Sequence, residues 1–354
     1  MSNDSRAEAR RQIEICNACR YCEGFCAVFP AMTRQRTFAL ADMTQLANLC
    51  HNCQGCYNGC RYTAPHEFAI NLPAVLADVR AQSWERFASP APLARAVQRN
   101  GLWTLWILVL LTAGILLVSP APAAPRNFYS YFSHNALVSV FGPLFLASLL
   151  LTALGLRRFW REVGGRALQW RDLASALRSA ANLRHLSGGQ GQGCQYEDGD
   201  RYSQRRRWAH QAVMYGFLLC FASTSVATVM HYVWAWPAPY AWYTPPKLLG
   251  VPGGVLLSVG CVALMVLKSR AKPELASASR WSGDWAFIGA LLLTGASGLL
   301  VYAAGSSPYL RPLLALHLGA VASLFALLPY SKWVHGFYRL AALAREAQIA
   351  TGRP

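Results

Sequence analysis

The sequence predicts an all-α protein with a small helical, cysteine-rich domain followed by a six-span transmembrane helical bundle. The chain of 354 residues is 54% hydrophobic and only 14% charged, which is typical of a membrane protein with a modest soluble part. Two cysteine runs of identical spacing precede the first long apolar stretch, and six apolar stretches follow them. We therefore expect residues 1–98 to form the soluble domain and residues 99–354 the membrane domain.

The two cysteine runs define the N-terminal domain. Residues 16–26 read CNACRYCEGFC and residues 50–60 read CHNCQGCYNGC, so both follow C-x2-C-x2-C-x3-C. This spacing is that of a two-cluster ferredoxin, in which the fourth cysteine of each run ligates the other cluster. One [4Fe–4S] cluster is therefore assigned to Cys16, Cys19, Cys22 and Cys60. The other is assigned to Cys50, Cys53, Cys56 and Cys26.

The surroundings of the runs indicate the kind of ferredoxin. The proline that usually follows the fourth cysteine is missing, because Ala27 and Arg61 occupy these positions. The 23 residues between the runs contain few β-branched residues and favour helix, so we expect an α-helical, two-cluster ferredoxin-like domain. Two zinc sites of four cysteines each are the alternative. Zinc sites seldom use three cysteines at two-residue gaps with a fourth, which favours iron–sulfur clusters.

The cysteine-rich part is expected to be cytoplasmic. The first hundred residues contain no apolar h-region of a signal peptide, since charged residues recur every few positions. Thiols stay reduced in the cytoplasm, where clustered cysteines usually bind metal. A secreted disulfide scaffold is therefore disfavoured.

Six apolar stretches are long enough to cross a hydrocarbon core of about 30 Å as helices of about 20 residues. Helices are the default for such segments because lipid offers no partner to an unpaired backbone group. The expected spans are residues 102–118, 136–156, 212–234, 248–267, 285–303 and 313–330.

The distribution of basic residues predicts the orientation of the bundle. Of the 33 Lys and Arg residues, 30 lie in residues 1–101, 157–209, 268–284 and 331–354. The connections on the other side carry three and contain no Asp or Glu. By the positive-inside rule, both termini and the cytoplasmic loop 157–209 lie inside. The excess of basic residues falls between apolar segments and not on one face, which argues against a nucleic-acid partner.

Four histidines mark the ends of two expected spans. His210 begins the third span and His231 ends it, while His317 begins the sixth and His335 ends it. Ionisable groups in spans are costly and usually mark functional sites. Because the two spans are antiparallel, His210 and His335 share the inner level, and His231 and His317 share the outer level.

This arrangement predicts two b haems, each held by an axial imidazole from either side. The 18 residues between His317 and His335 make five turns, which puts both on one helix face about 27 Å apart. Four-helix cores commonly host cofactors between facing helices. His134, just ahead of the second span, is the competing outer ligand. The simpler interpretation is that these histidines merely reach water near the headgroups. Four histidines at matched positions disfavour this interpretation.

Together these motifs resemble those of a known family. Two cysteine runs followed by a six-span domain with HQAVMYGFLLCFASTSVATVMHY are similar to the tricarballylate- or citrate-utilisation protein B family over essentially the whole chain. The histidine arrangement also resembles the cytochrome b subunit of respiratory nitrate reductase. The resemblance implies iron–sulfur clusters, haem b, and reoxidation of a partner FAD-dependent tricarballylate dehydrogenase, with quinone as the electron acceptor.

The leading functional hypothesis is a membrane-bound electron-transfer subunit in the bacterial inner (cytoplasmic) membrane. Its partners are expected to be the flavoprotein, a membrane quinone and the lipid bilayer. A self-contained quinone- or heterodisulfide-linked membrane reductase is the alternative, although the sequence has no dinucleotide fingerprint and no convincing acid–base set. A zinc-bearing membrane scaffold or transporter without redox function is a third hypothesis.

Overall fold

A computed structural model describes residues 3–120, 128–188, 191–195, 201–236, 238–275, 281–305 and 307–352. Within these ranges the regular secondary structure is helical, apart from one isolated β-bridge between Cys194 and Ser203. The all-α prediction is therefore confirmed. The Gly-rich part of the 157–209 connection lies partly outside the described residues.

The N-terminal part consists of short helices that place the two cysteine runs between them. The first run starts inside a helix and leaves it at Arg20, whose φ of 55° belongs to the left-handed region. The segment between the runs is helical, as expected from its composition. The helices are α1 (Asn3–Cys19), α2 (Val28–Thr33), α3 (Leu40–Leu49), α4 (Gly55–Asn58) and α5 (Leu72–Phe87).

Six helices of the second part are long and apolar enough to cross a membrane, so the chain is a multi-pass membrane protein. Each contains one of the spans expected from hydropathy, and most extend beyond it. The six are α7 (Gly101–Val118), α9 (His134–Glu162), α11 (Arg205–Trp234), α12 (Pro245–Ser269), α13 (Trp281–Ala304), and α14 (Leu310–Leu327) with η4 (Leu328–Tyr330).

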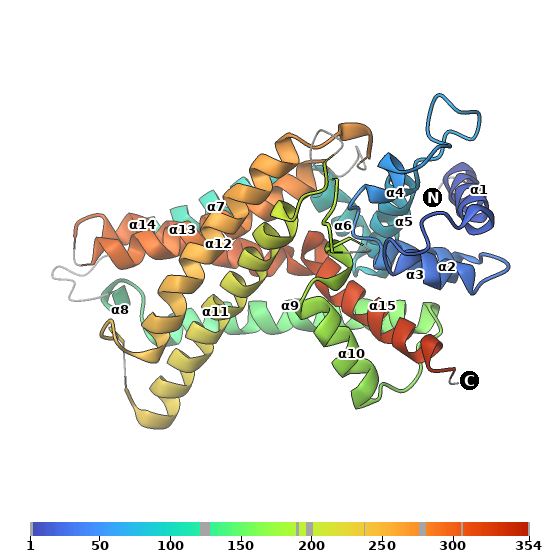
Figure 1. Ribbon diagram of the computed structural model, residues 1–354. Coiled ribbons are helices and arrows are strands. Elements are labelled where there is room, and N and C mark those ends of the chain that lie inside the picture. The colour runs from blue at the N-terminus through green and yellow to red at the C-terminus, as the bar shows by residue number, and fades with distance from the viewer. Residues whose placement is uncertain are drawn as a thin grey trace.

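Shorter helices connect and extend the bundle. The amphipathic α6 leads into the first span, and α15 follows the last span and runs back beside the N-terminal part (Figure 1). These elements are α6 (Ala91–Arg99), α8 (Phe128–Tyr131), α10 (Trp170–Ala181), η1 (Arg184–Leu186), η2 (Pro273–Leu275), η5 (Lys332–Val334) and α15 (His335–Ala350).

Helices α11 and α12 pack closely because glycines line their interface. A Cβ added to Gly253 would lie 2.9 Å from the backbone nitrogen of Cys220, and one added to Gly260 would lie 2.8 Å from that of Val213. In lipid there is little hydrophobic drive between helices, so small residues that allow close backbone approach stabilise the pair. Any larger residue at these two positions would force the helices apart.

An ionic cluster joins three elements at the end of the bundle that carries the N-terminal part, here called the inner end. The Oδ2 atom of Asp284 in α13 accepts hydrogen bonds of 2.9 Å from both Lys268 of α12 and Lys332 of η5. Helix α13 begins four residues before the expected span, so that Asp284 lies within it. The carboxylate pairs with both ammonium groups, so none of the three charges is left unpaired. An unpaired charge would be costly where it is removed from water.

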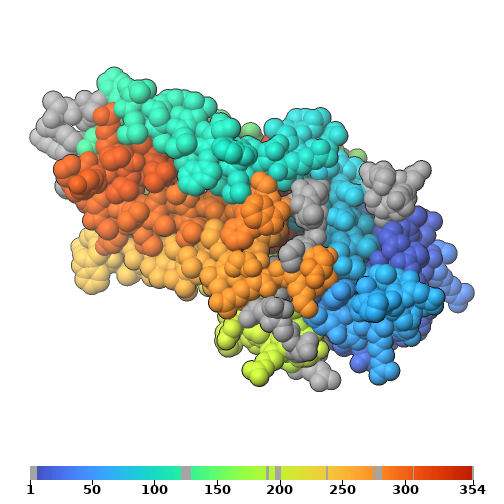
Figure 2. Space-filling view, turned by 90° about the horizontal axis from the view of Figure 1, so that it is seen from above, coloured from blue at the N-terminus to red at the C-terminus, as the bar shows by residue number. Residues whose placement is uncertain are grey.

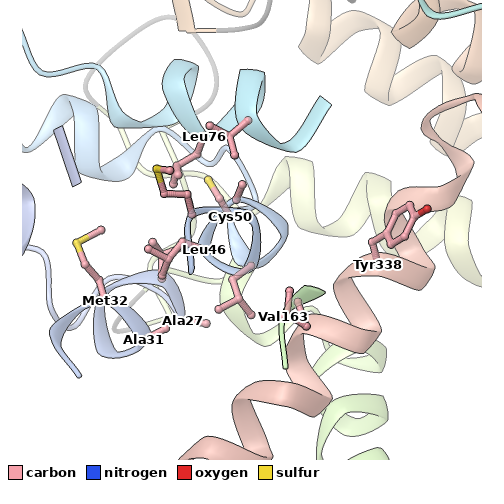
Figure 3. Packing of buried hydrophobic residues seen from close by; sticks show 14 of the residues in the cluster. Ala27, Ala31, Met32, Leu46, Cys50, Leu76, Val163 and Tyr338 are labelled. Atoms are coloured by element: carbon pink, nitrogen blue, oxygen red, sulfur yellow. The ribbon is translucent and has the colours of Figure 1, made fainter. Parts of the chain in front are cut away.

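The N-terminal part and the inner end of the bundle share one hydrophobic core. Phe87 of α5, Phe159 of α9 and Tyr338 of α15 contact one another with ring centroids 5.3–5.9 Å apart. Figure 3 shows Val163 of the second part next to Leu46 of the first, and Tyr338 of α15, farther from them, belongs to the same buried cluster. Full burial of a phenylalanine side chain stabilises a fold by about 1.5–3 kcal/mol, so this core fixes the two parts together.

The molecule is elongated, with the N-terminal helices at one end and the bundle extending away from them (Figures 1 and 2).

Polar contacts also join the N-terminal part to the inner end of the bundle. Gln45 of α3 donates a hydrogen bond to the carbonyl of Ala342 in α15 over 2.8 Å, and Arg86 pairs with Glu162 over 2.5 Å. The expected boundary at residues 98 and 99 falls at the end of α6 and stays a prediction.

Candidate metal centres

Three cysteines of the first run line a cavity that two cysteines of the second run, Cys56 and Cys60, also line. The cavity has a volume of about 460 Å³, and its lining includes Cys16, Cys19, Cys22, Cys56 and Cys60. Burial, followed by the charges of Cys60, Cys22 and Cys19, raises the pKa of Cys16 to about 12. The side chain of Cys60 therefore lies with the first run, as crossed ligation requires.

The second run receives Cys26 in return. Burial raises the pKa of the Cys26 thiol, and the next contributions come from Cys53 and Cys50. The pKa of Cys56 is likewise raised by burial, then by Cys53, Cys50 and Cys26. The fold thus places the last cysteine of each run beside the opposite run.

Backbone groups near the thiols offer hydrogen bonds to sulfur. Among the described residues, no three His, Cys, Asp or Glu side chains form a group that could hold a metal ion. Backbone N–H groups of Asn52 and Tyr62 approach the sulfurs of Cys50 and Cys60 at 3.3 and 3.4 Å. Hydrogen bonds of this kind to sulfur tune iron–sulfur clusters.

The two runs differ in their access to solvent. Cys19 of the first run is exposed, whereas Cys50 of the second is buried. The loop between α9 and α11 covers the second run, because Leu183, Leu186 and Cys194 pack against Cys53. Cys194 itself is buried to 2% exposure.

The inner pair of histidines comes together. The rings of His210 in α11 and His335 at the start of α15 lie 5.9 Å apart, centroid to centroid, at an interplanar angle of 85°. The Nδ1 atom of His335 lies 2.6 Å from the carbonyl of Lys332, whereas the buried Nδ1 of His210 has no hydrogen-bond partner among the described residues. Burial lowers the pKa of His335 to about 3, so its imidazole is neutral.

These features of the inner pair fit axial ligation of a haem. A neutral imidazole whose Nδ1–H is held by a backbone carbonyl presents Nε2 as the ligand atom. His335 has this arrangement. His210 presents a second ring from another helix, but its buried Nδ1 has no hydrogen-bond partner among the described residues.

At the outer level the structure groups the histidines differently from the expected pairing. His231 stacks on His134, with ring centroids 4.0 Å apart, and a ring nitrogen of His134 lies 3.0 Å from the hydroxyl of Tyr232. His317 faces α13 instead, where its Nδ1 lies 3.1 Å from the hydroxyl of Ser297. The described contacts do not join His231 to His317, so this pairing stays a prediction.

Aromatic side chains lie between the two histidine levels. Phe145 of α9 contacts Phe325 of α14 and Phe221 of α11 at centroid distances of 5.0 and 6.2 Å, and Phe217 contacts Trp333 at 4.4 Å. No motif in the sequence identifies these residues. Their spacing on separate helices carries no periodic signal that distinguishes them from ordinary core residues.

Comparisons with known proteins agree with the arrangement of the chain. The family described as Citrate utilization protein B matches residues 89–353, and its Fer4-like domain matches residues 9–86. A protein of Escherichia coli named Citrate utilization protein B is 41% identical over 351 residues, which are 97% of this chain and 92% of the relative. No solved structure matches. The chain therefore belongs to the Citrate utilization protein B family.

Proposed function

We propose that this protein is a membrane-bound electron-transfer subunit. It accepts electrons from the reduced FAD of a partner dehydrogenase of the tricarballylate type and delivers them to the quinone pool. The cysteines of the two runs hold [4Fe–4S] clusters, and the histidines of α11, α14 and α15 hold haem b. When bound, these groups transfer one electron at a time. They can therefore link the two-electron oxidation of a flavin to the two-electron reduction of a quinone.

One observation carries this proposal: residues one helical turn from each inner histidine hold the second cysteine run. Arg206, four residues before His210, donates to the carbonyl of Asn52 over 2.6 Å. Arg339, four residues after His335, donates to the carbonyl of Cys50. Because the same two helices present the histidines and bind the cysteine run, the two proposed redox sites form one continuous structural unit.

Other parts of the chain have separate roles in this proposal. The exposed first run offers a docking surface for the flavoprotein, while the loop containing Cys194 excludes water from the second run. The N-terminal part, α10 and α15 lie at the end of the bundle whose connections carry most of the basic residues. This distribution supports a cytoplasmic location for the iron–sulfur domain and both termini in a bacterial inner membrane.

The name of the relative supports a place in the utilisation of citrate or a related tricarboxylate. The partner dehydrogenase, not this chain, is proposed to act on that substrate. The described cavities provide no support for a substrate site on the chain itself, because the cavity of 460 Å³ is the one lined by the cysteines.

Purified protein is expected to contain iron and acid-labile sulfide and to show b-type α-bands after reduction with dithionite. A reduced flavoprotein dehydrogenase should then be reoxidised by a quinone analogue only in membranes that contain this chain. Membranes from cells lacking it are the control. Zinc without sulfide, or a reduced spectrum without α-bands, would contradict the cofactor assignment and favour a scaffold.

Mutation distinguishes His134 from His317 as the second ligand of the outer haem. If His231 pairs with His134, which lies beside it, then His134→Ala should remove one haem and His317→Ala should leave both. The original pairing of His231 with His317 gives the opposite result. Haem content per protein, measured by pyridine haemochrome, distinguishes the two, and His231→Ala should remove a haem in either case.

A further inference from the structure

Three arginines from three separate helices converge on the backbone of the second cysteine run. Arg80 of α5 donates to the carbonyl of Cys50 over 2.6 Å, and Arg339 of α15 donates to the same carbonyl and to that of Leu49. Arg206 of α11 donates to the carbonyls of His51, over 3.2 Å, and of Asn52. These arginines, here called the arginine cradle, surround residues 49–52 from the side of the membrane domain.

The cradle concentrates positive charge beside buried sulfur. The described residues form no ion pair with Arg80 or Arg339, although both are half-buried. Guanidinium groups remain protonated at neutral pH. Charges placed together inside a protein are costly unless an opposite charge lies nearby. Arg80 and Arg339 instead donate to neutral carbonyls, which leave the positive charge of these two side chains uncompensated among the described residues.

A cluster held by Cys50, Cys53, Cys56 and Cys26 would provide a compensating negative charge. Four thiolates make such a cluster anionic, and both Arg339 and Arg80 bind the backbone carbonyl of Cys50, one of the four proposed ligands. The first run has no comparable arrangement among the described residues. Arg20 and Arg61 line its cavity, but both side chains are exposed, and exposed charges are screened by salt.

We propose that the arginine cradle raises the reduction potential of the cluster held by the second run above that of the first. Reduction adds one negative charge, and nearby positive charge stabilises the reduced form. Electrons taken from the flavin at the exposed first run therefore move downhill to the second run, which adjoins the inner histidines. This inference rests on the proposed function and adds a direction to it.

The test is an EPR-monitored redox titration of the full-length protein in detergent. Cys19→Ala, which removes a first-run ligand in any pairing scheme, provides a background in which the remaining signal belongs to the second run. In that background Arg339→Gln should lower the ratio of reduced to oxidised cluster about tenfold at a fixed potential. For a one-electron couple this equals a shift of about −59 mV.

Two further variants separate charge from structure. Arg339→Lys retains the positive charge but not the planar fork, so it should keep the potential near that of the parent. Arg61→Gln removes an exposed charge from the other run and should leave the potential unchanged. If Arg339→Lys and Arg339→Gln shifted the potential equally, the arginine would act through hydrogen-bond geometry, and the electrostatic proposal would fail.

The outcomes also separate this inference from the function on which it rests. An absent iron–sulfur signal in wild-type protein would refute the clusters themselves. A normal signal whose potential does not change in Arg339→Gln would refute the cradle alone. If Arg339→Gln does not accumulate as folded protein, Arg80→Gln decides, because Arg80 binds the same carbonyl and should shift the same potential downward.

Discussion

Replacement of Cys60 by alanine is expected to remove the cluster of the first run and to spare that of the second. Cys60 lies among the cysteines that line the first cavity, and after burial it is the next largest cause that raises the pKa of Cys16 and of Cys22. Cys56 also lines this cavity but is assigned to the other cluster, so iron and acid-labile sulfide should fall by roughly half. Cys26→Ala should have the reciprocal effect.

Reference variants identify which cluster is lost. Cys19→Ala removes a first-run ligand and Cys53→Ala a second-run ligand, whatever the pairing of the fourth cysteines. Under crossed ligation, the signal that remains in Cys60→Ala matches that of Cys19→Ala in EPR line shape and midpoint potential. A match with Cys53→Ala would show that each run binds its own fourth cysteine. Cys220→Ala is the control, since Cys220 lies within α11 and away from both runs.

Replacement of His335 by glycine is expected to abolish binding of the inner haem. His335 contacts His210, and its Nδ1 is fixed by the carbonyl of Lys332. Loss of one of two axial imidazoles leaves the remaining ring without its opposing ligand. The intensity of the reduced α-band should fall by roughly half if two haems are bound, and electrons from reduced flavoprotein should no longer reach quinone.

Chemical rescue separates ligation from a structural role. Free imidazole added to His335→Gly should restore the haem band, because it can occupy the space of the missing side chain. His185→Ala is a matched control, since His185 lies at the inner end in η1 and hydrogen-bonds Ser179 over 3.3 Å. Unchanged haem content in His335→Gly would contradict the assignment of the inner ligand.

The shared core has a consequence for how the two parts of the chain function together. Phe87, Phe159 and Tyr338 join α5 to α9 and α15, and the arginine cradle spans the same junction. The cysteine runs therefore cannot move far from the inner histidines without breaking apolar contacts. A fixed separation of this kind suits electron transfer, which depends on distance between centres, better than it suits a mobile carrier domain.

Much of this architecture is readable from sequence because its signals are local. Apolar stretches of about 20 residues must be helices in lipid, and all six expected spans were confirmed. The cysteine spacing identified the iron–sulfur domain that the family comparison supports. The helices nevertheless begin and end beyond the expected limits, since α9 and α11 continue through Arg158 and Arg206 into the inner polar region.

The sequence by itself determined the all-α class, the six spans and the paired cysteine runs, because helical periodicity and ligand spacing act over short stretches of chain. The expectation that His317 and His335 lie on one face of a single helix was wrong, since α14 ends at Leu327 and His335 begins α15. Only the tertiary structure decided which side chains meet across helices. It placed His134 against His231 and turned His317 toward Ser297. It also gathered the arginine cradle from helices far apart in the chain. The rotation of one helix against another depends on the packing of whole faces, and no local pattern encodes it.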